Sequence, residues 1–185
     1  MESIRAFIAV EIKDNTLIQK ILDIQKEFSQ TSANLKLVEP ENIHFSLRFL
    51  GNISSAMVDK IYEAMKSVKF SPFELELYGV GCFPSLSRIN NVWIGTRKGK
   101  EEITRIYDEL EEQIIKLKFK PEGRGYTPHA TIARVKSAYN KDKLAKIISK
   151  FSSLEIGSMT VNTVQLKESK LTPKGPIYST LRSAP

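Results

Sequence analysis

Hydrophobic residues in the first half of the chain follow the spacing of strands and helices in turn. Some segments alternate hydrophobic and polar residues, as strands with one buried face do, most strictly the run Phe-Glu-Leu-Glu-Leu-Tyr at 73–78. Others place hydrophobic residues every three or four positions, as amphipathic helices do. The pattern predicts strands over 5–12, 43–50 and 73–80 and helices over 15–30 and 54–68.

The second half of the chain repeats this order. The pattern predicts strands over 92–96, 129–135 and 177–182, a strand-rich segment over 154–168, and helices over 100–118 and 140–150. The intervals also agree, because Ala6 and His44 are 38 residues apart and Val92 and His129 are 37 apart. An internal duplication explains this match, although alternation by chance explains the order alone equally well. We expect an α+β fold of two similar lobes, each an antiparallel sheet backed by helices, related by a pseudo-two-fold axis around a central cleft.

The composition fits one compact domain. Of the 185 residues, 41% are hydrophobic and 26% are charged, which is ordinary for a globular protein. The lone Cys82 excludes an internal disulfide and a multi-cysteine zinc site. No stretch approaches the roughly 20 apolar residues of a membrane span, and the N-terminus lacks the pattern of a signal peptide. We expect a single bilobal domain over residues 1–185 that can exchange strands between its halves, present as a cytoplasmic monomer without membrane attachment.

The net charge changes this picture only in part. The chain carries 28 Lys and Arg against 21 Asp and Glu, a net charge of +7. A positive field favours anionic partners such as RNA. A solvated lysine-rich surface explains the same numbers, because the basic residues form no clustered stripe. The charge is therefore compatible with RNA binding without establishing it.

The two histidines of the chain share one local pattern. His44 begins the run His-Phe-Ser-Leu and His129 begins His-Ala-Thr-Ile, so each is followed by an apolar residue, a hydroxyl residue and an aliphatic residue. Ser and Thr make up 28 of the 185 residues, so a hydroxyl in both places has a chance of roughly 2%. One strand histidine alone is more often structural than catalytic. The matched pair favours a shared chemical role and supports the duplication.

This spacing places chemistry on one face of each strand. Alternate side chains of a strand point the same way, so His44 lies beside Ser46 and His129 beside Thr131. If the lobes face each other, both hydroxyls can bind the oxygens of one phosphate while the imidazoles flank the phosphorus. Two imidazoles with ordinary pKa values near 6.5 can supply the base and the acid of an in-line displacement without a metal or cofactor. The chain has neither a His-Glu-x-x-His zinc signature nor a Gly-x-x-x-x-Gly-Lys-Ser phosphate loop.

These residues resemble those of the two-histidine (2H) phosphoesterase superfamily, which is marked by a duplicated His-x-[Thr/Ser]-x (HxTx) tetrapeptide. They are most similar to its RNA 2′,3′-cyclic phosphodiesterase branch, also called the 2′-5′ RNA ligases. The similarity extends along nearly the whole chain. It includes residues 5–9 (Arg-Ala-Phe-Ile-Ala), 41–51, 81–84, 92–95, 128–134 and 166–169. The family usually has Thr where Ser46 stands; serine keeps the hydroxyl donor and drops a methyl group.

The resemblance implies a hydrolase that opens RNA 2′,3′-cyclic phosphate ends, tRNA-like fragments among them, to 2′-phosphomonoesters. His44 would be the proton donor and His129 the proton acceptor, with Ser46 and Thr131 binding the phosphate. In reverse, a 5′-hydroxyl end could be joined through a 2′-5′ linkage. The resemblance also favours Arg134 as a phosphate ligand. Simple alternation from His129 would point that side chain away, so a β-bulge or the strand end would have to re-aim it.

Three further residues could contact the substrate. Alternation places Arg48 on the face of His44 and Ser46, where substrate contact and a solvated charge are both open. Phe7 and Tyr126 could stack on a base, although a core position is favoured for Phe7. Four basic residues flank the predicted strands, and they either steer RNA or are simply solvated: Arg88, Arg97, Lys120 and Arg124.

Two other functions fit the same residues. One is a phosphodiesterase for another small cyclic nucleotide, because the four motif residues contact only the phosphate and selectivity depends on loops. The other is a basic RNA-binding module whose histidines contact phosphate without catalysis. Turnover of a nucleoside 2′,3′-cyclic phosphate in excess chelator distinguishes an enzyme from such a module.

Overall fold

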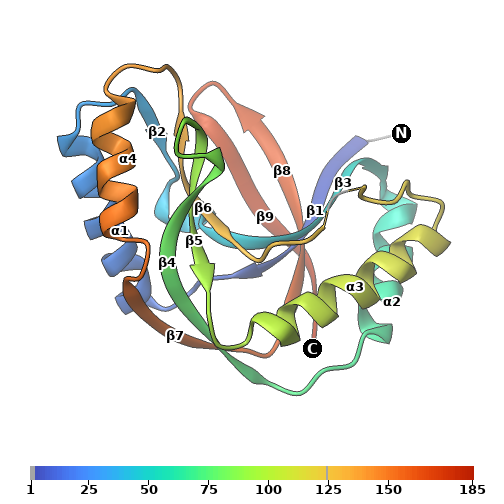
Figure 1. Cartoon of the computed structure of the whole chain (residues 1–185). Helices are drawn as coiled ribbons and strands as arrows, with labels where there is room; N and C mark the ends of the chain where they lie inside the picture. Colours follow the sequence, from blue (N-terminus) through green and yellow to red (C-terminus); the bar gives the residue numbers. More distant parts are fainter. Residues whose placement is uncertain (1–2, 124) are drawn as a thin grey trace.

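A computed structural model describes residues 3–123 and 125–185, so Met1, Glu2 and Arg124 of the expected domain lie outside it. The described residues form one antiparallel sheet of nine strands with four α-helices (Figure 1). The strands are β1 (Ser3–Glu11), β2 (Leu35–Leu37), β3 (His44–Ser54), β4 (Phe73–Ser85), β5 (Arg88–Thr96), β6 (Ala130–Val135), β7 (Glu155–Val161), β8 (Val164–Thr172) and β9 (Gly175–Ala184). The helices are α1 (Asn15–Gln30), α2 (Ser55–Ser67), α3 (Lys100–Lys116) and α4 (Lys141–Lys150), and a short 3-10 helix, η1, covers Pro40–Asn42.

The sheet consists of two halves with mirrored strand orders. Its order is β7-β4-β5-β6-β3-β1-β8-β9, with β2 paired to β6. The halves meet where β3 pairs with β6 through Phe45 and Ala130. On either side of this joint the strands correspond, β3 to β6, β1 to β5, β8 to β4 and β9 to β7. This arrangement confirms the predicted α+β fold of two similar antiparallel lobes.

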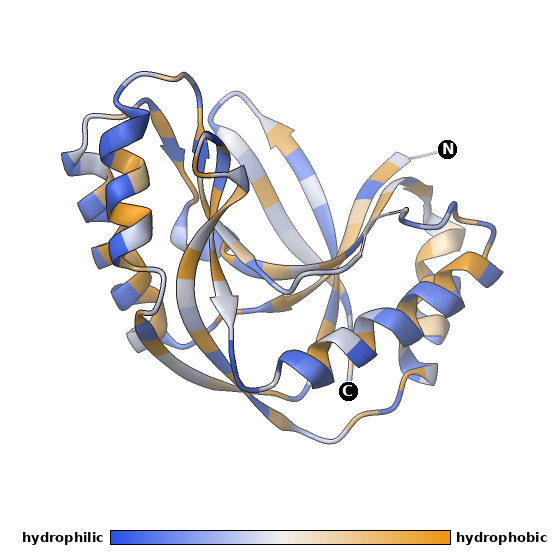
Figure 2. Ribbon diagram, in the orientation of Figure 1, coloured by the Kyte–Doolittle hydropathy of each residue, from blue (hydrophilic) through white to orange (hydrophobic). Residues whose placement is uncertain are grey.

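The helices cover each half with segments from both repeats. Helices α1 and α4 pack on the β4–β7 half, and α2 and α3 pack on the half built around β3 and β9 (Figure 1). Hydrophobic and hydrophilic residues alternate along these helices, as expected for helices with one face on a sheet (Figure 2). Helix α1 follows β1 in the chain yet packs on the opposite half. Neither half therefore completes its core from one repeat alone.

Several predicted strands extend further in the structure, and two differences have a clear cause. The strand-rich segment 154–168 is divided by Asn162 and Thr163 into β7 and the start of β8, which lie in different halves of the sheet. The strand predicted over 92–96 begins earlier, at Arg88, because it forms a hairpin with β4. Both differences arise from strand pairing, which the hydrophobic pattern of one segment does not contain.

A β-bulge occurs at the corresponding place in each histidine strand. In β3, Arg48 pairs with Ile8 and Ser46 pairs with Ala9, so Leu47 is an extra residue. Leu47 and Arg48 are consequently both buried, and Phe49 returns to the exposed face. The extra residue inverts the alternation of the residues that follow it, as far as a second register shift at Leu50.

The bulge in β6 has the same form. Thr131 pairs with Trp93 and Ala133 pairs with Val92, which leaves Ile132 as the extra residue. Ile132 and Ala133 are both fully buried, and Arg134 is exposed. Arg134 is therefore the counterpart of Phe49, each lying one residue beyond a buried pair that follows the hydroxyl residue.

Candidate active site

The two tetrapeptides meet at the joint of the sheet. Phe45 and Ala130 are both fully buried and form the pair that joins β3 to β6. Because neighbouring residues of a strand point to opposite faces, the residues flanking this pair share the other face. These are the four motif residues, all partly exposed: His44, Ser46, His129 and Thr131.

The antiparallel pairing fixes the relation between the histidines. With Phe45 opposite Ala130, His44 comes opposite Thr131, and Ser46 comes opposite His129. The two histidines are then diagonal neighbours, and in a regular ladder the Cβ atoms of such neighbours are roughly 7 to 8 Å apart. This separation leaves room for one phosphate group between the two rings.

Each imidazole is oriented by a backbone carbonyl two residues upstream. His44 Nδ1 is 2.8 Å from the Asn42 carbonyl oxygen, and His129 Nδ1 is 2.7 Å from that of Thr127. Because a carbonyl oxygen only accepts, Nδ1–H donates in both rings, and the neutral form presents an unprotonated Nε2. His44 Nε2 lies 2.9 Å from Ser46 Oγ, whose hydroxyl can donate to it. Both histidines therefore offer Nε2 for proton transfer.

Aromatic rings hold each imidazole in a corresponding way. The His44 ring centroid is 5.0 Å from that of Phe7 and 5.5 Å from that of Tyr178. The His129 centroid is 4.9 Å from that of Phe83 and 6.2 Å from that of Trp93. The two sets of rings come from different ladder positions, because Phe7 pairs with Phe49 whereas Trp93 pairs with Thr131. Each histidine is thus packed by two aromatic rings, although the rings themselves are not duplicated position by position.

Burial and neighbouring charges lower the pKa of His44 to about 4. Burial is the largest cause, and the cations Lys167 and Arg134 act in the same direction. The Asn42 carbonyl and the Glu11 carboxylate oppose this shift. His44 is therefore neutral near pH 7 in the empty site.

The pKa of His129 is also lowered. Burial is the main cause, and the hydrogen bond from Nδ1 to the Thr127 carbonyl opposes it. Two cations act on His44, whereas burial and the Thr127 carbonyl govern the pKa of His129 in the described part of the chain. The two equivalent imidazoles thus differ in their electrostatic surroundings.

Arg134 reaches the His44 side of the site from β6. Its guanidinium donates to Asn91 Oδ1 over a long 3.4 Å contact, and its charge acts on both His44 and Tyr178. The bulge at Ile132 supplies the reorientation that simple alternation did not allow. An exposed guanidinium in this position is free to bind a phosphate oxygen.

Neither of the two roles open for Arg48, a substrate contact or a solvated charge, fits the position of its side chain. The bulge at Leu47 turns this side chain to the buried face, where its exposed fraction is 6%. There Arg48 Nε lies 2.6 Å from a Glu111 carboxylate oxygen, and Nη1 donates to Glu122 over 2.9 Å. Nη2 donates to the Lys120 carbonyl over 2.5 Å. Arg48 therefore ties β3 to α3 and to the loop that leads to His129.

The two proposed stacking residues are also occupied. Tyr126 stacks on Tyr107, with ring centroids 4.2 Å apart and ring planes 9° apart, and its hydroxyl is buried, so one face of its ring is already occupied. Burial raises the pKa of Tyr126 and keeps its hydroxyl protonated. Phe7 is 3% exposed and supports the His44 ring from below, in agreement with its core position.

An aromatic residue that the sequence did not single out lies beside the site instead. Phe49 is 62% exposed, and its ring centroid is 6.0 Å from that of Phe7. It owes this exposure to the bulge in β3, since unbroken alternation would bury it. A large exposed ring next to a phosphate-sized site is a suitable platform for a base.

Of the flanking basic residues, Arg97 is already engaged. It donates to Glu76 over 2.9 and 2.7 Å and to Glu155 over 2.8 Å, so its charge is compensated. Arg88 and Lys120 are exposed, and Arg124 lies outside the described residues.

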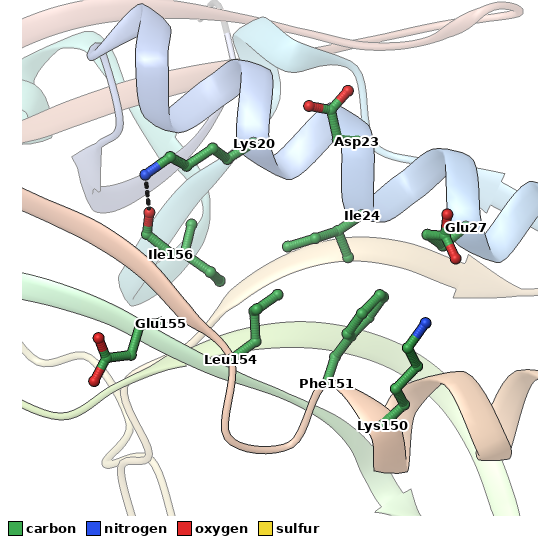
Figure 3. Close-up of a pocket in the computed structure, with 9 residues that line it drawn as sticks. All are labelled: Lys20, Asp23, Ile24, Glu27, Lys150, Phe151, Leu154, Glu155 and Ile156. Atoms are coloured by element: carbon green, nitrogen blue, oxygen red, sulfur yellow. Dashed lines mark hydrogen bonds between the residues drawn. The ribbon is translucent and has the colours of Figure 1, made fainter.

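Two hollows can be distinguished on the described residues. One, of about 400 Å³, lies beside His44 and includes Glu11, Lys13, Lys167 and Tyr178. The other, of about 380 Å³, lies between α1 and the segment from Lys150 to Ile156 (Figure 3). It shares no lining residue with the hollow beside His44. Only the first hollow has a histidine in its wall.

Sequence comparison places the chain in a family. The model of the LigT-like phosphoesterases matches residues 11–93 and again residues 94–178. The chain therefore belongs to the LigT-like phosphoesterase family, and the two matches correspond to the two repeats. This confirms the resemblance that the paired tetrapeptides indicated.

Curated relatives specify the branch of this family. A Methanothermobacter thermautotrophicus protein named RNA 2′,3′-cyclic phosphodiesterase is 39% identical over 178 residues, covering 95% of each chain. A protein of the same name from Aeropyrum pernix is 38% identical over 165 residues, covering 89% of this chain and 94% of its own.

Solved structures agree with the fold. E. coli LigT complexed with 3′-AMP superposes with a TM-score of 0.80 at 21% identity, covering 98% of this chain and 97% of its own. A Thermus thermophilus protein gives a TM-score of 0.81 at 22% identity, covering 97% of this chain and 96% of its own.

In the described part of the chain, no helix combines the length and apolarity needed to cross a membrane.

Proposed function

We propose that this protein hydrolyses RNA 2′,3′-cyclic phosphate ends to 2′-phosphomonoesters, with His44 as proton donor and His129 as proton acceptor. The observation that carries the proposal is the diagonal placement of the two imidazoles around the Phe45–Ala130 pair. Each presents Nε2, since each Nδ1–H is held by a carbonyl. The names of the curated relatives support the same reaction.

The reaction is an in-line displacement at phosphorus. His129 Nε2 accepts a proton from water as the water oxygen bonds to phosphorus. The bond from phosphorus to the 3′ oxygen breaks on the opposite side, and that oxygen takes a proton from His44 Nε2–H. The phosphate remains on the 2′ oxygen. When a 5′-hydroxyl takes the place of water, its oxygen bonds to phosphorus, its proton passes to His129, the 3′ oxygen leaves with a proton from His44, and a 2′-5′ linkage forms.

Three side chains bind the phosphate in this proposal. Thr131 and Ser46 donate hydroxyl hydrogen bonds to its non-bridging oxygens, and the Arg134 guanidinium compensates its charge. The Ser46 hydroxyl turns from His44 Nε2 to the phosphate when substrate binds. Phe49 offers its exposed ring to a base, which places the nucleoside on the His44 side and agrees with His44 as the acid.

Substrate binding has to change the protonation of His44. Its pKa of about 4 leaves it neutral in the empty site, whereas an acid must begin protonated. The phosphate anion brings negative charge to the ring and raises this pKa. Binding is therefore coupled to proton uptake, and affinity should increase as the pH falls from 8 to 6.

The test uses an RNA that ends in a 2′,3′-cyclic phosphate. The enzyme should convert it to the 2′-phosphate in excess chelator, as judged by chromatography against 2′- and 3′-phosphate standards. Replacing either histidine by alanine should slow the reaction by about 100-fold or more. A 3′-phosphate product would reverse the assigned orientation. Unchanged turnover in both variants would show that the histidines are not catalytic.

A further inference from the structure

A buried ion pair lies against His44, and among the described residues the matching strand positions beside His129 carry no charge. Lys167 of β8 is 6% exposed, and its ammonium contacts Glu11 of β1 and lies 3.2 Å from Thr180 Oγ1. Glu11 is the strand partner of His44 in the β1–β3 ladder. Both residues of the pair line the hollow beside His44.

The duplication shows what stands in the equivalent place of the other half of the sheet. Lys167 pairs with Phe7, which in turn pairs with Phe49. In the half that contains His129, Arg134 matches Phe49 and pairs with Asn91, and Asn91 pairs with Phe83. The position that matches Lys167 is therefore occupied by Phe83, whose ring centroid is 4.9 Å from that of His129. An apolar ring lies beside His129 where an ammonium group lies in the half that contains His44.

We propose that Glu11 and Lys167 are positioning residues that make two structurally equivalent histidines unequal, so that one acts as acid and the other as base. This inference rests on the proposed function for the roles of acid and base. The pair contacts no reacting atom and acts through the field it sets at His44. Two oppositely charged groups in a buried, fixed geometry provide a lasting field of this kind.

The charges facing His44 come from several elements. Lys167 and Arg134 disfavour its protonated form, and Glu11 favours it. Tyr178 packs on the ring and stays neutral, since burial raises the pKa of its hydroxyl. Two more charged side chains line the same hollow, Glu41 from η1 and Lys13 after β1; the Lys13 ammonium lies 2.7 Å from the second carboxylate oxygen of Glu11. The Glu11–Lys167 pair is the buried member of this set.

Opposite substitutions test the proposal. In Lys167→Met the Glu11 carboxylate loses its buried partner, so the pKa of His44 should rise by about half a unit or more. In Glu11→Gln the Lys167 ammonium is left unopposed, so the pKa of His44 should fall by a similar amount. The double variant should return toward the wild-type value. A disturbance of structure would move both single variants in the same direction.

Imidazole carbon–proton NMR measures this directly, because the chain has only two histidines and His129→Gln assigns them. The His129 titration serves as an internal control and should not move. Lys98→Met is the matched control, since it removes a lysine paired with Glu74 in the other half of the sheet. Shifts of the same sign in both variants, or no shifts, overturn the proposal. Turnover of a cyclic phosphate by the wild-type protein is measured in parallel, so that failure of the proposed reaction is recognised separately.

Discussion

Replacing Arg48 by methionine distinguishes two roles for this residue. If Arg48 contacted the substrate, its replacement would raise KM and leave the free energy of unfolding unchanged. In the structure the guanidinium is buried between β3, α3 and the loop at 120–122, and it does not reach the site. Methionine fills a similar volume without charge, so the change removes the polar contacts while keeping most of the packing.

The size of the effect follows from the contacts that are lost. Glu111 keeps only 14% of its side chain exposed, and leaving such a carboxylate without its buried partner costs about 3 to 5 kcal/mol. Glu122 is 33% exposed, so water compensates most of its loss. The carbonyl of Lys120 also loses its donor, which adds about 1 kcal/mol. Relaxation of Glu111 toward water offsets part of this sum, and a net loss of about 3 to 4 kcal/mol is expected.

Urea unfolding followed by circular dichroism measures this loss, and steady-state kinetics on a cyclic-phosphate RNA measure KM. The midpoint of thermal unfolding should fall by roughly 10 °C, with KM within about threefold of the wild-type value. Arg97→Met is the matched control, because it removes an exposed arginine paired with two glutamates and should leave stability nearly unchanged. Unchanged stability together with a raised KM in Arg48→Met would refute the structural role.

Three other substitutions probe the site. Gly81→Ala should lower kcat by at least about tenfold, because its Cβ overlaps the Trp93 ring, whose centroid is 6.2 Å from that of His129, the proposed proton acceptor. Gly123→Ala, with open space around it, should be neutral by the same assay. Phe49→Ala should raise KM by about tenfold through lost base stacking without changing the free energy of unfolding, and an unchanged KM would exclude the stacking role. His44 is neutral in the folded protein down to about pH 4, whereas the unfolded chain takes the proton near pH 6.5. The free energy of unfolding should therefore fall as the pH drops from about 6.5 to about 4. The fall should be larger in wild type than in His44→Gln, by up to about 3 kcal/mol. An equal pH dependence of the two proteins would contradict the lowered pKa of His44.

The histidine motifs and the repeat could be predicted because they are local. A tetrapeptide on a strand needs only alternation to place His44 beside Ser46, and the matching intervals reveal the duplication. The side on which Arg48 and Arg134 lie could not be predicted in the same way. Each depends on one extra residue, which leaves the hydrophobic pattern of the strand almost unchanged and reverses the side chains that come directly after it.

Long-range partners explain the remaining errors. Glu122 is 74 residues from Arg48 in the chain, and nothing near Arg48 indicates it. Tyr126 looked like a base platform because its stacking partner, Tyr107, belongs to a helix whose position depends on the whole fold. Phe49 was not singled out because its exposure depends on the bulge in β3, which the local sequence does not reveal. Sequence spacing alone brings the four motif residues to one face of the sheet, whereas the positions of Arg48, Tyr126 and Phe49 depend on tertiary contacts.

The crossing of α1 and α3 between the halves makes the molecule indivisible. A chain cut between the repeats would leave each fragment with a helix whose hydrophobic face belongs against the other fragment. Such fragments could fold only by associating with each other, so the positions of the two imidazoles are lost together on unfolding. The proton donor and the proton acceptor of the proposed reaction therefore depend on a single folding unit.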